Sequence, residues 1–235
     1  MPKVSVIMPS LNVANYIDLC LTSVMQQSLA DLEIICVDGG SNDGTLDILN
    51  HYAASDSRIH IIHADKKSYG YQMNLGIRAA TGEYIGIVET DDFVPRDMFE
   101  KLYHAAKEHH ADVVKADFYR FMEKDGSYAC RYNRLDDTDR YYSKVVSAAE
   151  NLPIFRMIMN TWSGIYRRHF LMENGIEHNE SPGASYQDNG FWFRTFCCAK
   201  RIFFIPEPYY MNRRDNPNSS VFSKYKLYCM SDEYD

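Results

Sequence analysis

The chain has 235 residues, of which 46% are hydrophobic, and its 25 Lys and Arg against 32 Asp and Glu give a formal net charge of -7. Such a chain can bury a sizeable core, which excludes an intrinsically disordered protein. The acidic balance argues against a nucleic-acid-binding protein, because affinity for a phosphate backbone comes largely from clustered cations.

The cysteines and the N-terminal sequence indicate in which cellular compartment the protein is expected. None of the six cysteines forms a Cys-x-x-Cys pair, and we expect them to be reduced, as in a cytosolic protein. The apolar run at residues 4–8 stops at Pro9, which makes it too short for a signal peptide or a membrane span. We therefore predict a cytoplasmic protein and leave open a peripheral contact with the inner membrane face.

Residues 1–94 alternate between short apolar runs and amphipathic patterns. The apolar runs predict strands, and apolar residues three and four apart predict helices, the first with Asn12 or Asn15 as its N-cap. The predicted elements are strands at 4–8, 32–37, 59–63 and 84–88 and helices at about 13–25, 45–54 and 69–80. This alternation predicts an α/β fold in which helices flank a mostly parallel central sheet.

The second half is less regular, and residues 127–142 allow no firm assignment. The patterns predict helices at 95–110, near 148–157 and after Asp188, and strands at 113–121, 162–166 and 202–205. Residues 225–235 begin a helical pattern without finishing it, so we expect the natural chain to continue. No internal repeat interrupts the sequence, and we predict a single domain over residues 1–235.

Three carboxylates, Glu89, Asp91 and Asp92, lie within four residues directly after the strand predicted at 84–88. Such a cluster repels itself unless a cation neutralises it. Mg²⁺ and Mn²⁺ take oxygen ligands, often one or two carboxylates together with substrate phosphates. The loop indicates a divalent-metal site, although a solvated loop that caps the next helix explains its spacing equally well.

Asp38 lies in a second polar loop, VDGGSNDGT at residues 37–45. Glycines let a backbone approach a ligand closely, and an acid here is suited to bind a base or a ribose. Taken alone, the loop is more simply an ordinary turn with Ser41 or Asp43 as a helix cap. It is neither G-x-G-x-x-G nor G-x-x-x-x-G-K-[ST], so a dinucleotide oxidoreductase and a P-loop kinase lose their main support.

Four motifs occur in order: VSVIMPSLN at 4–12, VDGGSNDGT at 37–45, NLGIRAATGEYI at 74–85 and ETDD at 89–92. Together they resemble the family 2 glycosyltransferases, which have a GT-A fold, invert the anomeric centre and use nucleotide sugars. The resemblance implies that about residues 1–94 bind the nucleotide sugar and about 95–225 bind the acceptor. It assigns to the donor Pro9, Ser10, Asn12, Asp38, Asn74, Glu89, Asp91 and Arg214.

The same resemblance gives roles to the metal and to two later residues. Asp91 and Asp92 match the motif that holds Mn²⁺ or Mg²⁺ on the diphosphate, with Asp91 favoured. Asp188 matches the catalytic base, which takes the proton of the attacking acceptor hydroxyl. Arg214 matches an arginine that closes over the donor phosphates, which suits its planar guanidinium. Without the family, Asp188 is more simply a helix cap, and Arg214 belongs equally well to an exposed turn around Pro217.

Three positions depart from the family pattern: Glu89 stands where Asp is usual, Gly39 where a second acid is common, and Gln187 where Glu precedes the base. The leading hypothesis is a hexosyltransferase that moves a sugar from a UDP-linked donor to a hydroxyl of a glycan or lipid-linked acceptor. The departures leave open a nucleotide-sugar-binding domain without activity. A nucleotidyltransferase is a further alternative, but residues 9–12 lack the Gly-rich, Arg-containing loop it needs. The sugar, the linkage and the oligomeric state are not predictable from these patterns.

Overall fold

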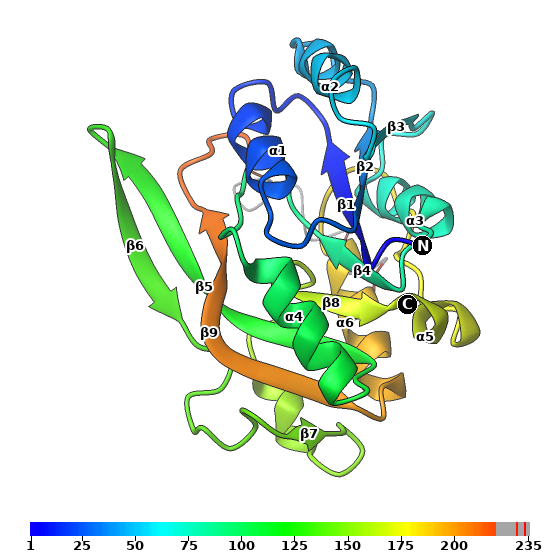
Figure 1. Cartoon of the computed structure of the whole chain (residues 1–235), viewed down its shortest axis with the longest axis vertical. Helices are drawn as coiled ribbons and strands as arrows, with labels where there is room; N and C mark the ends of the chain where they lie inside the picture. The colour runs from blue at the N-terminus through cyan, green and yellow to red at the C-terminus, as the bar shows by residue number, and fades with distance from the viewer. Residues whose placement is uncertain (220–228, 230–232, 234–235) are drawn as a thin grey trace.

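The computed structural model describes residues 1–219, 229 and 233 and forms an α/β fold around one sheet (Figure 1). The strands are β1 (Val4–Ser10), β2 (Leu32–Asp38), β3 (Ile59–His63), β4 (Tyr84–Ile87), β5 (Val113–Lys124), β6 (Ser127–Asn133), β7 (Val145–Val146), β8 (Gly164–Arg167) and β9 (Ile202–Arg213). The helices are α1 (Ile17–Met25), α2 (Thr45–Ala53), α3 (Tyr69–Ala79), α4 (Met98–Glu108), α5 (Arg168–Glu173) and α6 (Gln187–Cys198), with a 3-10 helix η1 at Leu152–Arg156. The predicted α/β class is confirmed.

The sheet order is β3-β2-β1-β4-β8-β5-β9-β7, with β6 paired to β5. The four strands of the first half run parallel, as predicted, because each is joined to the next by a helix. In the second half, β8 runs antiparallel to both β4 and β5, and β5 pairs with β9 in parallel. The β5–β6 hairpin projects beyond the body of the sheet (Figure 1).

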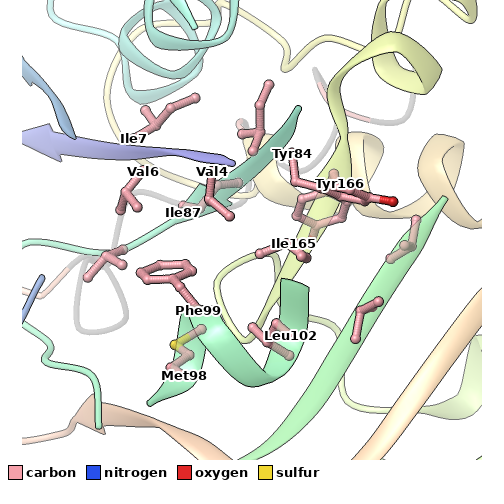
Figure 2. Close-up of a cluster of buried hydrophobic side chains, with 14 of the residues drawn as sticks. Val4, Val6, Ile7, Tyr84, Ile87, Met98, Phe99, Leu102, Ile165 and Tyr166 are labelled. Atoms are coloured by element: carbon pink, nitrogen blue, oxygen red, sulfur yellow. The ribbon is translucent and has the colours of Figure 1, made fainter. Parts of the chain in front are cut away.

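The core lies between the central strands and the helices on either side, with α4 in front and α6 behind (Figure 1). Figure 2 shows Val4 and Ile87 of the strands near Phe99 and Leu102 of α4, all of them buried. Glycine allows this packing to be tight, since a Cβ on Gly86 would lie 2.5 Å from the Phe99 ring.

Three predictions about local structure need correction, and one unassigned stretch forms a strand. The helix expected near 148–157 is only the short η1, whose first turn contains Pro153. The first helix starts four residues late, at Ile17, and its N-cap is Tyr16 rather than Asn12 or Asn15. Residues 127–133, left unassigned, form β6. The last strand runs on to Arg213, because its second half pairs with β5 beyond a bulge.

None of the helices in the described ranges is long and apolar enough to cross a membrane. All six cysteines, Cys229 included, are free. The helical pattern expected at 225–235 falls almost entirely outside the described residues.

Candidate functional site

The two acidic loops meet because β1 lies between β2 and β4, and all three strands end at the same edge of the sheet. The end of β1 ties them together. The carbonyl oxygen of Pro9 accepts a hydrogen bond of 2.7 Å from the Thr90 hydroxyl, and that of Ser10 accepts one of 2.8 Å from the Gly39 N–H. Pro9 and Ser10 therefore position both loops through their backbone.

Asp38 is 2% exposed, and its two carboxylate oxygens differ. Oδ2 accepts hydrogen bonds from the Gly40 and Ser41 N–H groups at 3.0 and 3.1 Å. Oδ1 is buried, and within residues 1–219, 229 and 233 no group donates to it. A buried acceptor without a donor is costly. Asp38 thus offers one oxygen to a ligand.

Asn12 holds the Asp38 loop in shape. Its Oδ1 accepts a 2.9 Å hydrogen bond from the Asn42 N–H, and its own N–H donates to the Ser41 hydroxyl at 3.0 Å. Positive φ angles of 86° at Gly40 and 98° at Gly44 require glycine in this turn. The Oδ1 of Asn12 therefore has a protein donor, which points to a role in shaping the turn.

Gln72 fills the space beside Gly39, the position where a second acid is common. Its amide group donates hydrogen bonds of 2.9 Å to the carbonyl oxygens of Ser10 and Val37, which joins the ends of β1 and β2. A Cβ at Gly39 would lie 2.7 Å from the Gln72 Nε2. The space that a side chain at position 39 would need is filled from α3.

Glu89 lies against two tyrosines. Its Oε1 accepts a 2.7 Å hydrogen bond from the Tyr69 hydroxyl, and its N–H donates to the Tyr210 hydroxyl at 3.0 Å. Burial, opposed by the Tyr69 hydrogen bond and aided by the charges of Asp91 and Asp188, raises the pKa of Glu89 to about 8. This carboxyl group is therefore largely protonated at neutral pH when no cation is near.

Asp92 faces β9. It is 1% exposed, and its carboxylate accepts a 2.6 Å hydrogen bond from the Arg213 N–H and a 3.1 Å hydrogen bond from the Asn212 amide. Burial, and then the charge of Asp91, raises its pKa. These contacts join the acidic loop to the last strand, so the protein's own donors already occupy the second predicted metal ligand.

Asp91 is the more open carboxylate. Its Oδ2 accepts a 2.8 Å hydrogen bond from the Asn216 amide, and Oδ1 has no donor among the described residues. The Arg213 guanidinium donates a hydrogen bond of 2.9 Å to the backbone carbonyl of Asp91. This bond fixes the loop and does not involve the Asp91 carboxylate. Of the two aspartates, Asp91 is placed to bind a ligand.

Asp188 lies in the first turn of α6, directly after Gln187. Burial is the main cause of the raised pKa of both Tyr69 and Glu89, and the charge of Asp188 contributes to both, so its carboxylate is electrostatically close to the acidic loop. The Gln187 amide donates to the carbonyl oxygens of Ser181 and Gly183 at 3.1 and 3.2 Å. Gln187 thus organises the loop that leads to Asp188.

Asn74 is 1% exposed and uses its whole amide inside the protein. Its nitrogen donates to the His178 carbonyl at 2.9 Å and to Glu180 at 3.1 Å, and its oxygen accepts from the His178 N–H at 2.8 Å. These bonds hold the segment before α6 against α3. These contacts support a positioning role for Asn74, and its predicted contact with the donor stays a prediction.

The two late arginines have different surroundings. Arg213 is 7% exposed, and its guanidinium lies 3.2 Å from Asp215 and 4.7 Å from the centre of the Phe121 ring. Arg214 is half-buried, and its backbone N–H donates to the Phe121 carbonyl at 2.9 Å. No described acidic side chain pairs with the Arg214 guanidinium. The predicted phosphate-binding residue is therefore the one whose charge is available.

The fit of a divalent cation rests on Asp91. In the part of the chain that the structure describes, no cluster of three or more His, Cys, Asp or Glu side chains forms a metal site. Mg²⁺ and Mn²⁺ do not need one, since one or two carboxylates and substrate phosphates often complete their coordination. The Asp91 oxygen that has no donor among the described residues suits such a cation, and a bound cation would favour the ionised form of the neighbouring Glu89.

Sequence patterns missed Tyr69, Tyr210, Asn216 and Arg213 as neighbours of the acidic loop. The three that lie in or after β9 are more than 115 positions from the loop in the chain, and no local spacing links them to it. Tyr69 stands at the start of α3, where its position carries no separate signal.

The comparisons with known proteins agree with this geometry. The model of "Glycosyl transferase family 2" matches residues 5–173. EpsJ of Bacillus subtilis, described as an uncharacterized glycosyltransferase, is 32% identical over 96% of this chain and 64% of its own length. Glycosyltransferase GlyG of Streptococcus pneumoniae is 30% identical over 90% of this chain and 70% of its own length. The chain spans less than two thirds of the length of EpsJ.

Two solved structures share the fold. S. aureus TarS 1-349 in complex with UDP-GlcNAc has a TM-score of 0.77 at 22% identity and covers 94% of this chain and 61% of its own. A mannosyltransferase of Pyrobaculum calidifontis in complex with GDP-Man and Mn2+ has a TM-score of 0.64 at 18% identity and covers 93% of this chain and 58% of its own.

The fold and the site define the class as a glycosyltransferase domain of the GT-A type. More narrowly, the chain belongs to glycosyl transferase family 2. Asp188 and Arg214 lie beyond the residues that the family model matches.

Proposed function

We propose that the chain is an inverting hexosyltransferase that uses a nucleoside-diphosphate sugar with Asp188 as the general base. The observation that carries the proposal is that Asp38 and Asp91 lie at one sheet edge and that the charge of Asp188, in the first turn of α6, acts on the same acidic loop. Among the described residues, nothing donates a hydrogen bond to Oδ1 of Asp38 or to Oδ1 of Asp91, and the charge of Asp188 raises the pKa of Glu89, which lies two residues before Asp91.

In the proposed reaction, the acceptor hydroxyl gives its proton to the Asp188 carboxylate as its oxygen attacks the anomeric carbon. The new carbon–oxygen bond forms opposite to the bond that breaks, so the anomeric configuration inverts. The electron pair of the broken bond leaves with the nucleoside diphosphate. A divalent cation held by Asp91 would stabilise the charge that develops on the diphosphate, and Arg214 would bind its oxygens.

The donor side of the proposal is a UDP-linked sugar. TarS, whose fold this chain shares, is in complex with UDP-GlcNAc. The unpaired Oδ1 of Asp38 is an acceptor suited to an N–H of a base or a ribose hydroxyl. Mn²⁺ or Mg²⁺ is the proposed cofactor, since the mannosyltransferase with the same fold is in complex with Mn2+.

The acceptor proposed is a glycan or a lipid-linked glycan, in the cytoplasm or at the inner membrane face. Trp162 supports an acceptor site beside Glu89, because its ring stacks on that of Tyr210 with 4.4 Å between their centres. The flat apolar face of an aromatic ring such as that of half-buried Trp162 is a surface on which a sugar can pack.

Donor hydrolysis and transfer with Mn²⁺ test the proposal, comparing the wild type with Asp188→Asn. The variant should bind the donor and lose at least a hundredfold in turnover, because the carboxylate that takes the proton is gone. The matched control is Asp47→Asn, since Asp47 also lies in the first turn of a helix, α2, and is exposed. Equal turnover by the wild type and Asp188→Asn would contradict the assignment of Asp188 as the base. Donor binding without turnover by the wild type would favour a nucleotide-sugar-binding domain without activity.

A further inference from the structure

Three arginines gather on one face of the ladder formed by β6, β5 and β9. Arg120 of β5 is the direct cross-strand partner of Arg131 in β6, and on its other side it is level with Asn212 in β9. Side chains of residues paired in this way point to the same face of the sheet. Arg214 follows two residues after Asn212 and extends the ladder, since its N–H bonds to the Phe121 carbonyl.

These arginines lack acidic partners. Among the residues that the structure describes, Arg120, Arg131 and Arg214 form no ion pair, whereas Arg213 forms them with Asp215 and Glu123. The Nε of Arg120 is buried without a hydrogen-bond partner, and its guanidinium lies 5.6 Å from the centre of the Phe118 ring. Burial, and then the positive charges of Arg214 and Arg131, lowers the pKa of Arg120. In a chain with net charge -7, like charges gathered in this way call for an anionic ligand.

The same face leads directly to the acidic loop. Along β9 and its extension, Tyr210 bonds to the Glu89 N–H, Asn212 bonds to the Asp92 carboxylate, and Arg214 comes next in the row. A cation at Asp91 and the donor diphosphate would occupy the loop end of this row. Arg120 and Arg131 lie level with Asn212 on the neighbouring strands β5 and β6, on the side of the projecting hairpin (Figure 1).

We infer that Arg120, Arg131 and Arg214 form a second oxyanion site, which binds a phosphate group of the acceptor beside the donor. The inference rests on the proposed function, since it names the class of acceptor as one that carries phosphate. Arginine suits this task because its guanidinium meets two oxygens of a phosphate at once. Arg214 would then contact both substrates, with Arg120 and Arg131 contacting the acceptor alone.

The test measures binding without turnover. The thermal unfolding midpoint of the full chain is followed as inorganic phosphate is added at constant ionic strength, with and without saturating UDP and Mg²⁺. The variants are Arg120→Gln/Arg131→Gln and the matched control Lys101→Gln/Arg140→Gln, which removes the same charge from exposed positions elsewhere. Wild type and control should show a saturable rise that persists with UDP bound, and the Arg120/Arg131 variant should lose at least tenfold in phosphate affinity.

The outcomes distinguish a site for an acceptor phosphate from a site for the diphosphate of the donor. An equal rise in all three proteins, or no saturable rise, overturns the site. If UDP abolishes phosphate binding and the Arg120/Arg131 variant also loses UDP affinity, the arginines belong to the donor and the acceptor assignment is wrong. If UDP fails to bind the wild type while phosphate still distinguishes the variants, the proposed function fails and the anion site stands.

Discussion

The two faces of the β5–β9 ladder use arginine in opposite ways. On one face, Arg213 is buried against Asp215, Glu123 and the Phe121 ring, and its Nε bonds to the Asp91 backbone. On the other, Arg214 lies near other guanidinium groups and has no acidic partner among the described residues. The two neighbouring arginines therefore differ in their contacts: Arg213 pairs with acidic side chains and the acidic loop, and the charge of Arg214 has no acidic partner in the part of the chain that the structure describes.

The same division runs through the acidic loop. Asp92 accepts hydrogen bonds from Asn212 and Arg213, while one Asp91 oxygen has no donor within the described residues. A residue that the fold already uses should lower stability when it is changed. Substitution of a residue left for a ligand should weaken ligand binding and leave stability nearly intact. Measuring both quantities therefore tests the difference between Asp91 and Asp92 and that between Arg213 and Arg214.

The largest effect is expected for Asp91→Asn. It should weaken Mn²⁺-dependent donor binding at least a thousandfold, or about 4 kcal/mol, because the metal loses its anionic ligand. Calorimetry with UDP and Mn²⁺ measures this. Asp92→Asn is the matched control and should instead cost about 2 kcal/mol of stability, since its amide faces two N–H donors. Unchanged metal-dependent donor binding in Asp91→Asn would contradict the assignment of Asp91 to the ligand and Asp92 to the fold.

Arg213→Met should lower the free energy of unfolding by about 3 kcal/mol, because it leaves Asp215 and the Asp91 carbonyl without their buried partner. Urea unfolding measures the loss. Arg214→Met, the change at the neighbouring position, should cost less than about 0.5 kcal/mol. Similar losses of unfolding free energy in Arg213→Met and Arg214→Met would show that the two faces of the ladder do not differ in how they use arginine.

His178 lies in the segment before α6 that Asn74 holds by hydrogen bonds, and its titration predicts how stability depends on pH. Burial lowers the pKa of His178 to about 3, and neither ring nitrogen has a partner in the described part of the chain. Below its unfolded pKa of about 6.5, the unfolded chain binds the extra proton, so stability falls as pH falls from about 6.5 toward 3. Between pH 8 and pH 5 this amounts to about 2 kcal/mol.

His178→Phe keeps the stacking on Phe191, whose ring centre lies 4.1 Å away, and removes the titration. Urea unfolding at pH 8 and pH 5 should therefore show a loss about 2 kcal/mol smaller in the variant than in the wild type. Equal losses in both proteins would mean that the wild-type His178 finds a partner when protonated.

The smallest effect is expected for Asp38→Asn. The amide can keep one oxygen for the Gly40 and Ser41 N–H groups but presents a donor to the ligand, so UDP affinity should fall about tenfold, or 1.4 kcal/mol. Calorimetry checks this against Asp47→Asn, which should bind like the wild type. An unaltered affinity in Asp38→Asn would remove Asp38 from the donor site.

The sequence by itself determined the parallel half of the fold and the place of the acidic loops. Continuous apolar runs such as residues 4–8 and 32–37 form strands buried on both faces, and the polar residues after them must lie at the strand ends. The motifs in this half are local, so their order along the chain was enough to suggest the family, which the comparisons then confirmed.

Only the tertiary structure decided which polar groups remain for a ligand. Asp91 and Asp92 are alike in sequence, and so are Arg213 and Arg214. What separates the aspartates is the placement of residues 211–216 against residues 89–93, where both Asp92 oxygens but only one Asp91 oxygen accept hydrogen bonds from described residues more than 115 positions away. A hydrogen bond over such a separation leaves no spacing in the sequence, because the fold and not the local chain brings its partners together.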